Sequence, residues 1–119
     1  MHPRVVHCQR GQYDVYVGRG RCPRTGQESI FGNPFSHLKD SLASVRVKTR
    51  VEAIQAYEAW LRGTAYLTVE PARRLEILKV LSELRLVRLG CWCAPKPCHG
   101  ETLLRLAEEI FFNGKLLSA

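Results

Sequence analysis

The residues best suited to chemistry are the cysteines and histidine of the segment CWCAPKPCHG at 91–100, which holds three of the five cysteines. Side chains alternate along a strand, so Cys91 and Cys93 are expected to share one face while Trp92 packs on the other. Cys98 and His99 stand where a helix is expected to begin, and the unpaired N–H groups there favour a thiolate. We therefore expect an exposed, activated Cys98, with His99 as its catalytic partner.

Zinc binding is an alternative for the same segment, because Cys91, Cys93, Cys98 and His99 together offer the four ligands of a tetrahedral site. Adjacent Cys98 and His99 depart, however, from the separated ligand pairs that are usual in structural zinc sites. A third interpretation makes Cys91 and Cys93 small apolar core residues. Because the number of cysteines is odd and no export signal is recognised, we expect all five thiols to be reduced.

A second group of candidate residues lies in the segment GRGRCPR at 18–24. Gly18 would let the backbone approach a ligand, and the guanidinium groups of Arg19 and Arg21 suit phosphate or carboxylate. The segment has neither the Walker A pattern nor the dinucleotide-binding GxGxxG pattern. A mobile, solvated loop is the alternative interpretation.

The third candidate is Gly32-Asn33-Pro34-Phe35, whose Asn-Pro pair is typical of a turn. We expect Phe35 to anchor this loop in the core and Asn33 to be held rigidly, so that its amide can contact a polar edge of a ligand. A purely structural turn accounts for the same residues. Gly32, Asn33, Pro34 and Cys93 complete the predicted ligand-binding set.

The charge distribution favours an anionic partner. The formal net charge is +7, and residues 1–50 hold 9 basic and 3 acidic side chains, against 9 and 8 in residues 51–119. An excess of positive charge on one part of a chain favours nucleic acid, nucleotides or other phosphate compounds as partners. A generally basic, soluble surface is the alternative.

The elements that must position these residues are short strands followed by helices. The β-rich segments 4–8 and 13–17 predict strands, the Gly- and Pro-rich segment 18–40 predicts a long structured loop, and 86–93 predicts a central strand. The predicted helices run from an N-cap at Thr49 to a stop at Gly63, over 71–84, and over about 99–112. The leucines expected to be buried in the second helix are Leu75, Leu78, Leu81 and Leu84. Both tryptophans, Trp60 and Trp92, are expected in the core.

This order of elements predicts one small layered α/β domain over residues 1–119, with a short, at least partly parallel sheet flanked by about three helices. No segment is apolar enough to span a membrane, so we expect a soluble, cytoplasmic protein without a membrane partner. The sequence does not predict the oligomeric state.

These segments together resemble the domain of unknown function 4326 family of bacterial and phage proteins. One departure is Ile30-Phe31, where such proteins often place a Trp before Gly-Asn-Pro-Phe, and another is the unusually basic segment 36–49. The resemblance implies a compact α/β domain and no settled activity. The segments that carry it are YDVYVGR at 13–19, GNPF at 32–35, Ala53-Ile54, Tyr57, Trp60-Leu61, and LGCWCAP at 89–95 with Cys98-His99-Gly100.

In open α/β sheets, ligands bind beyond the carboxyl ends of the strands. We therefore expect a pocket there for a nucleotide or another phosphorylated ligand, with Arg19 on the phosphate and Asn33 on a polar edge. Cys98 and His99 would do chemistry or orient the ligand. The alternatives are a non-catalytic nucleic-acid-binding module that uses the basic N-terminal half, and a small zinc-stabilised interaction domain.

Overall fold

The fold is built on a short parallel sheet whose central strand comes late in the chain. The computed structural model describes residues 5–39, 43–92 and 96–117. Strand β5 (Leu89–Cys91) lies between β1 (Val5–His7) and β2 (Val15–Tyr16) and runs parallel to both. All three residues of β5 are buried, as expected for a strand with a neighbour on each side. The prediction of a central strand within 86–93 is confirmed.

A second, two-stranded parallel pair joins β3 (Phe35–Ser36) to β4 (Val45–Arg46). The long loop predicted over 18–40 therefore contains a strand, because both residues of β3 are buried and paired. Close packing explains one glycine of the central strand: a Cβ atom added at Gly90 would meet the Tyr13 ring at 2.5 Å, so any larger residue there would displace the ring.

Helix α1 (Arg50–Arg62) has the boundaries that the sequence predicts. The Thr49 side chain accepts a hydrogen bond from the Glu52 backbone N–H at 3.0 Å and so satisfies one unpaired donor of the first turn. The helix stops at Gly63, whose φ of 78° is costly for any residue with a Cβ atom. Helix α3 (His99–Asn113) stops at Gly114 in the same way.

The single helix predicted over 71–84 is divided into α2 (Pro71–Val80) and a 3₁₀ helix, η1 (Leu81–Leu86). With three residues per turn, η1 places Leu81 and Leu84 on one side, and both are buried. The expected burial of Leu75 was wrong, since its side chain is 55% exposed and α2 buries only Ile77. The spacing explains the error, because residues three apart advance only about 300° around an α-helix, so the four leucines cannot share one face of it.

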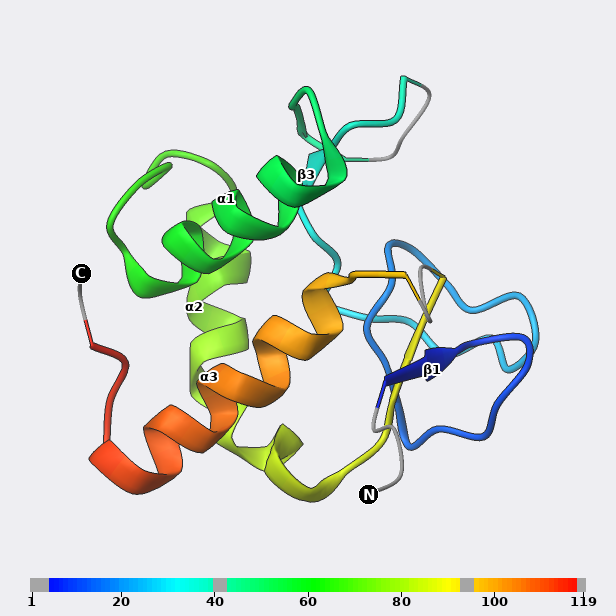
Figure 1. Cartoon of the computed structure of the whole chain (residues 1–119). Coiled ribbons are helices and arrows are strands. Elements are labelled where there is room, and N and C mark those ends of the chain that lie inside the picture. The colour runs from blue at the N-terminus through cyan, green and yellow to red at the C-terminus, as the bar shows by residue number, and fades with distance from the viewer. Residues whose placement is uncertain (1–4, 40–42, 93–95, 118–119) are drawn as a thin grey trace.

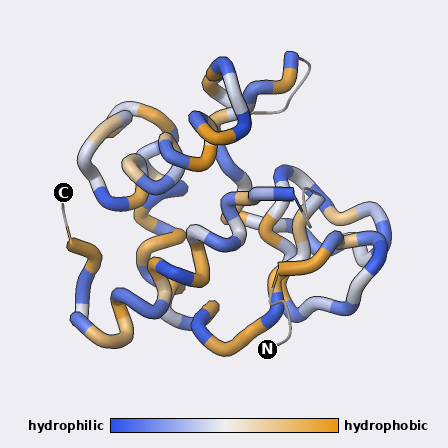
Figure 2. The backbone as a smooth tube through the Cα atoms, in the orientation of Figure 1, coloured by the Kyte–Doolittle hydropathy of each residue, from blue (hydrophilic) through white to orange (hydrophobic). Residues whose placement is uncertain are grey.

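Helix α3 crosses the middle of the molecule, between the other helices and the sheet (Figure 1). It packs against η1, α1 and β5, and its buried residues include Leu103, Leu106 and Ala107. Figure 2 shows hydrophobic residues along β1 and mostly hydrophilic residues in the loops that follow it. The main core therefore lies among the helices and one face of the sheet, and the polar loops gather at the sheet.

The two tryptophans differ in burial. Trp60 on α1 is fully buried, as predicted, and its Nε1 donates to the Val69 carbonyl oxygen at 2.7 Å. Trp92 is 45% exposed, so its predicted place in the core was wrong. It follows the last residue of β5, where the chain has already left the sheet. Within the described ranges, every helix is too short or too polar to cross a lipid bilayer.

Candidate ligand site

The carboxyl ends of the three parallel strands meet at one edge of the sheet. His7 ends β1, Trp92 follows β5, and Arg19 comes three residues after the end of β2. Because these strands are parallel neighbours, residues from three distant parts of the chain reach the same edge, where ligands of α/β proteins commonly bind. All three side chains line a single cavity.

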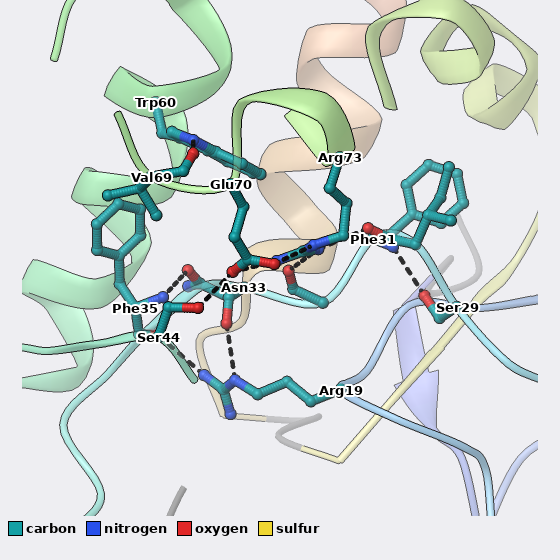
Figure 3. Close-up of polar contacts among 12 residues, drawn as sticks. Arg19, Ser29, Phe31, Asn33, Phe35, Ser44, Trp60, Val69, Glu70 and Arg73 are labelled. Carbon is teal, nitrogen blue, oxygen red and sulfur yellow. Dashed lines mark hydrogen bonds and ion pairs between the residues drawn. The ribbon is translucent and has the colours of Figure 1, made fainter. Parts of the chain in front are cut away.

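The loop that carries Asn33 is tied to α1 and to itself by the amide of that residue (Figure 3). Nδ2 of Asn33 donates to the Ala53 carbonyl oxygen at 3.0 Å, and Oδ1 accepts from the Phe35 N–H at 2.9 Å. Asn33 is buried and Phe35 is fully buried. The amide therefore anchors the loop through backbone partners at both of its ends, and Phe35 occupies the core as predicted.

Arg19 is held against this same loop (Figure 3). Its Nε donates to the Asn33 carbonyl oxygen at 2.7 Å and its Nη2 to that of Phe35 at 2.9 Å. Gly32 permits the approach, because a Cβ atom there would lie only 3.0 Å from the Arg19 Cα atom. The structure thus brings together Arg19, Gly32 and Asn33, three residues that the sequence placed in one site.

A cavity of about 180 Å³ lies on one side of Arg19 and is also lined by Asn33, Glu70 and Arg73. Arg73 donates from Nη1 to the carbonyl oxygens of Ile30 and Gly32, each at 2.6 Å, and from Nε to Glu70 at 2.8 Å (Figure 3). The hydrogen bond from Arg73 holds the pKa of the Glu70 carboxyl below its usual value. Within this smaller cavity, Glu70 therefore neutralises the charge of Arg73.

A larger cavity, of about 360 Å³, lies on the other side of Arg19 and is strongly basic. Four of its lining side chains are cationic and two are histidines, while none of the described lining residues is Asp or Glu. We call it the basic cavity. Positive charge without a lining carboxylate favours an anion in this space. Its lining residues are His7, Arg10, Arg19, Ser36, His37, Leu38, Arg50, Ala53, Ile54, Trp92, Lys96 and Pro97.

The indole of Trp92 is a wall of the basic cavity with a fixed orientation. Its Nε1 donates to the Tyr16 hydroxyl at 2.8 Å, and that hydroxyl donates to the Arg19 carbonyl oxygen at 3.1 Å. The His7 ring meets the indole edge-on, with 5.7 Å between the ring centroids. An aromatic face and an Arg-bearing loop are therefore connected through one buried tyrosine.

The predicted catalytic pair lies outside both cavities. Cys98 is the N-cap of α3, as the sequence predicted, but it is only 3% exposed and its sulfur accepts a hydrogen bond from the Gly100 N–H. The expectation of an exposed Cys98 was wrong, because the helix start is packed beneath the sheet edge. Burial is the main cause that lowers the pKa of His99 to about 4, so its imidazole is neutral at pH 7.

The sulfur atoms of Cys91 and Cys98 are joined in the structure, whereas Cys8 and Cys22 are free and buried. This differs from the expectation that every thiol is free. Cys91 ends the central strand and Cys98 starts α3, so the fold places side by side two cysteines that are seven residues apart. Cys93, predicted as a ligand-binding or metal-binding residue, lies outside the described residues.

Other predicted ligand residues lie in different places. Gly18 lies under the Tyr16 ring, where a Cβ atom would clash with the ring. Arg21 is exposed, pairs with Glu28 and lines neither of the two cavities. Pro34 lines the smaller cavity. Gly18 therefore lets the loop pack against Tyr16, and Arg21 lies on the loop surface. Neither residue lines the two cavities.

Several residues of the basic cavity were missed from the sequence. Arg10 follows β1, Arg50 is the first residue of α1, and Lys96 precedes the start of α3. Arg10 and Lys96 both come after strands, and this position could have identified them as candidate ligand-binding residues. In the sequence, that criterion was applied only to Arg19 and the cysteines. Arg50 could not be found in this way, because its side chain reaches the edge only through the packing of α1.

The fold and the site define a small α/β protein with a basic cavity at the carboxyl edge of a parallel sheet. The family model described as "Domain of unknown function (DUF4326)" matches residues 4–109, and the chain belongs to this family. It is also similar to the "Uncharacterized 12.4 kDa protein in nrdA-td intergenic region" of Enterobacteria phage T4, with 49% identity over 37 residues. That match covers 30% of this chain and 34% of the phage protein. No solved structure matches.

Proposed function

We propose that the protein binds a nucleotide or a similar phosphorylated ligand in the basic cavity. The observation that carries this proposal is the composition of the lining, which combines four cations and an aromatic wall with no described carboxylate. The volume of about 360 Å³ lies within the range of roughly 300–1,000 Å³ that is typical of small-molecule sites.

The phosphate would lie among Arg10, Arg50 and Lys96. Arg10 and Lys96 are exposed and Arg50 is half-buried, so their charged groups face the open side of the cavity. Arg19 lies deeper and uses two of its donors on the loop carbonyl groups, which keeps its charge in a fixed place. Guanidinium groups suit phosphate because their planar, forked donors can bind two oxygen atoms at once.

The base or another planar group of the ligand would lie against Trp92. The indole is 45% exposed, yet its Nε1 is already bonded to Tyr16, so its open surface is apolar. Leu38 and Ile54 add apolar surface to the same cavity. Aromatic side chains bind bases of any sequence by stacking, which is consistent with a site that recognises a class of nucleotides.

The proposal concerns binding, because Cys98 and His99 are buried and line neither cavity. Cys98 and His99 lie next to the wall of the site. Pro97, which precedes Cys98, lines the basic cavity, and so does Trp92, which follows Cys91. The two buried residues would support the wall of the cavity from within the protein.

Isothermal titration with nucleoside mono-, di- and triphosphates tests the proposal, with the unphosphorylated nucleoside and inorganic phosphate as reference ligands. We expect Arg50→Ala to weaken binding of the best nucleotide about tenfold or more, since a hydrogen bond to a charged group contributes about 1.5–3 kcal/mol. Lys79→Ala is the matched control, because Lys79 is an exposed cation of α2 that lines neither cavity. Trp92→Ala should lower the affinity for the nucleotide but leave the affinity for inorganic phosphate unchanged.

Two results would contradict the proposal. One is equal loss of nucleotide affinity in Arg50→Ala and Lys79→Ala. The other is tight binding of an oligonucleotide with no binding of mononucleotides at millimolar concentration. The second result would favour a nucleic-acid-binding module, whose affinity should fall steeply with salt as counterions are released.

A further inference from the structure

Three buried side chains converge behind the sheet edge, at the junction between β5 and α3. Cys91 is the last residue of β5, Cys98 is the N-cap of α3, and His99 is the first residue of that helix. They are 1%, 3% and 7% exposed, and their two Sγ atoms and one His nitrogen all lie within 4.8 Å of one another. The cluster is separate from the basic cavity, whose lining includes none of the three.

The spacing of sulfur and nitrogen matches a shared ion. The Sγ atom of Cys98 lies 3.7 Å from Nδ1 of His99. A tetrahedral zinc ion about 2.3 Å from sulfur and about 2.0 Å from nitrogen would hold these two donors about 3.5 Å apart. The adjacency of Cys98 and His99 in the sequence, unusual for structural zinc ligands, is therefore no obstacle in this conformation.

The surroundings of His99 leave Nδ1 available as a ligand. Its Nε2 lies 2.6 Å from the Val17 carbonyl oxygen, which can only accept, so Nε2 carries the proton and Nδ1 keeps its lone pair toward the sulfur atoms. Metal-binding histidines typically donate their second N–H to a carbonyl or carboxylate in this way. The Tyr57 ring meets the imidazole edge-on at 5.0 Å and helps to fix its orientation.

The competing interpretation is a disulfide, since the two sulfur atoms are in contact. The Cα atoms of Cys91 and Cys98 are 7.5 Å apart, beyond the range of about 4.4–6.8 Å that is usual for disulfides. In a disulfide the Cys98 sulfur has no proton to donate to His99 Nδ1, whose own proton position is already fixed on Nε2 by Val17. Around a tetrahedral ion the two sulfur atoms, which are in contact here, would lie about 3.8 Å apart, and the wide Cα–Cα separation is consistent with such a move.

We infer that Cys91, Cys98 and His99 bind one divalent metal ion, for which Zn²⁺ fits the mixed sulfur and nitrogen donor set best. In the reduced protein, where both sulfur atoms are thiols, the ion would displace the two thiol protons to solvent, and two metal–thiolate bonds would form. The Gly100 N–H, 3.3 Å from Cys98 Sγ, would stabilise that thiolate. The site would fasten the end of β5 to the start of α3 and so fix Trp92 and Pro97 at the basic cavity.

The test uses the full chain, prepared without oxygen and with no nucleotide present, so its result is independent of the proposed ligand. We expect about one Zn²⁺ per chain by elemental analysis. Replacement of Zn²⁺ by Co²⁺ should give the visible bands of tetrahedral Co²⁺ and near-ultraviolet thiolate-to-cobalt charge transfer. These readings need no variant, so they remain decisive even if a variant fails to fold.

Matched variants locate the site. Cys98→Ser should lower the affinity for Zn²⁺ by more than roughly 100-fold, the upper range for loss of a contact that only supports a metal ligand. Competition with a chromogenic chelator measures this affinity. Cys22→Ser is the control, because Cys22 is also buried but is free and belongs to another cluster. The inference is overturned if the anaerobic protein contains no stoichiometric metal and peptide mapping finds a Cys91–Cys98 disulfide. Equal loss of Zn²⁺ in Cys22→Ser would overturn it too.

Discussion

Polar residues at the sheet edge that look like ligand contacts by their type also hold the surrounding loop in place. Asn33 has the amide expected of a ligand contact, yet both ends of that amide bind backbone groups of the protein. Arg19 likewise donates to two carbonyl groups of the same loop. A buried polar side chain must find partners within the fold, and here these partners shape the wall of the cavity.

The two tryptophans give the sharpest prediction at the residue scale. Trp60→Ala should lower the free energy of unfolding by about 3–5 kcal/mol, because it removes a fully buried indole and its hydrogen bond to Val69. Trp92→Ala should lower it by only about 1 kcal/mol, since that indole is 45% exposed and its main internal contact is one hydrogen bond to Tyr16. Urea denaturation followed by circular dichroism measures both, and similar losses in the two variants would contradict this assignment.

Helices α1 and α3 are connected by charged groups as well as by apolar packing. Glu58 of α1 accepts hydrogen bonds from Arg105 of α3 and from Arg62 of its own helix. Arg62 also binds Glu109 of α3 at 2.7 Å. The hydrogen bond from Arg105, with that from Arg62, lowers the pKa of the Glu58 carboxyl from its ordinary value of 4.5 to about 2.

This network predicts a pH dependence at the scale of the helix pair. A carboxyl whose pKa is lower in the folded state adds stability above the unfolded pKa, and this contribution is lost as the pH falls from about 4.5 towards 2. Glu58→Gln should therefore lower the free energy of unfolding by about 1 kcal/mol at pH 7, since Arg105 is largely exposed and screened. The difference from wild type should shrink between pH 4.5 and pH 2.

Urea denaturation at a series of pH values measures this difference. Glu76→Gln, which removes an exposed carboxylate of α2, is the control and should change stability little at any pH. A constant difference between wild type and Glu58→Gln from pH 7 to pH 2 would show that the ion pairs are not the cause.

At the scale of the whole molecule, the sheet and the helices share one core. Leu89 of β5, Trp60 of α1 and Leu103 of α3 belong to the same buried cluster. A core cluster that includes residues of both the sheet and the helices predicts one cooperative unfolding transition. Whether the protein unfolds in one transition therefore tests the prediction that residues 1–119 form one domain.

Single-tryptophan variants can test this cooperativity. In Trp60→Phe the fluorescence reports on Trp92 at the sheet edge, and in Trp92→Phe it reports on Trp60 among the helices. In each variant we expect the fluorescence midpoint in urea to coincide with that of the helical circular dichroism signal. Separate midpoints would mean that the sheet edge unfolds as an independent unit.

The sequence by itself determined the features that depend on neighbouring residues. The limits of α1 followed from Thr49 and Gly63, because a cap and a left-handed glycine act within one helical turn. Parallel pairing followed from the order of strands and helices, since short connections restrict the topology. The N-cap position of Cys98 was predictable for the same local reason.

Only the tertiary structure decided which side chains are covered and which meet. Cys98 is buried and Trp92 is 45% exposed, although the polar neighbours of Cys98 and the apolar strand next to Trp92 predicted the reverse. Arg50 joins the basic cavity because α1 packs beside the sheet edge, and His99 reaches Val17 across 82 residues of sequence. Burial and contacts between distant residues depend on how whole elements pack, and periodicity within one element carries no information about its neighbour.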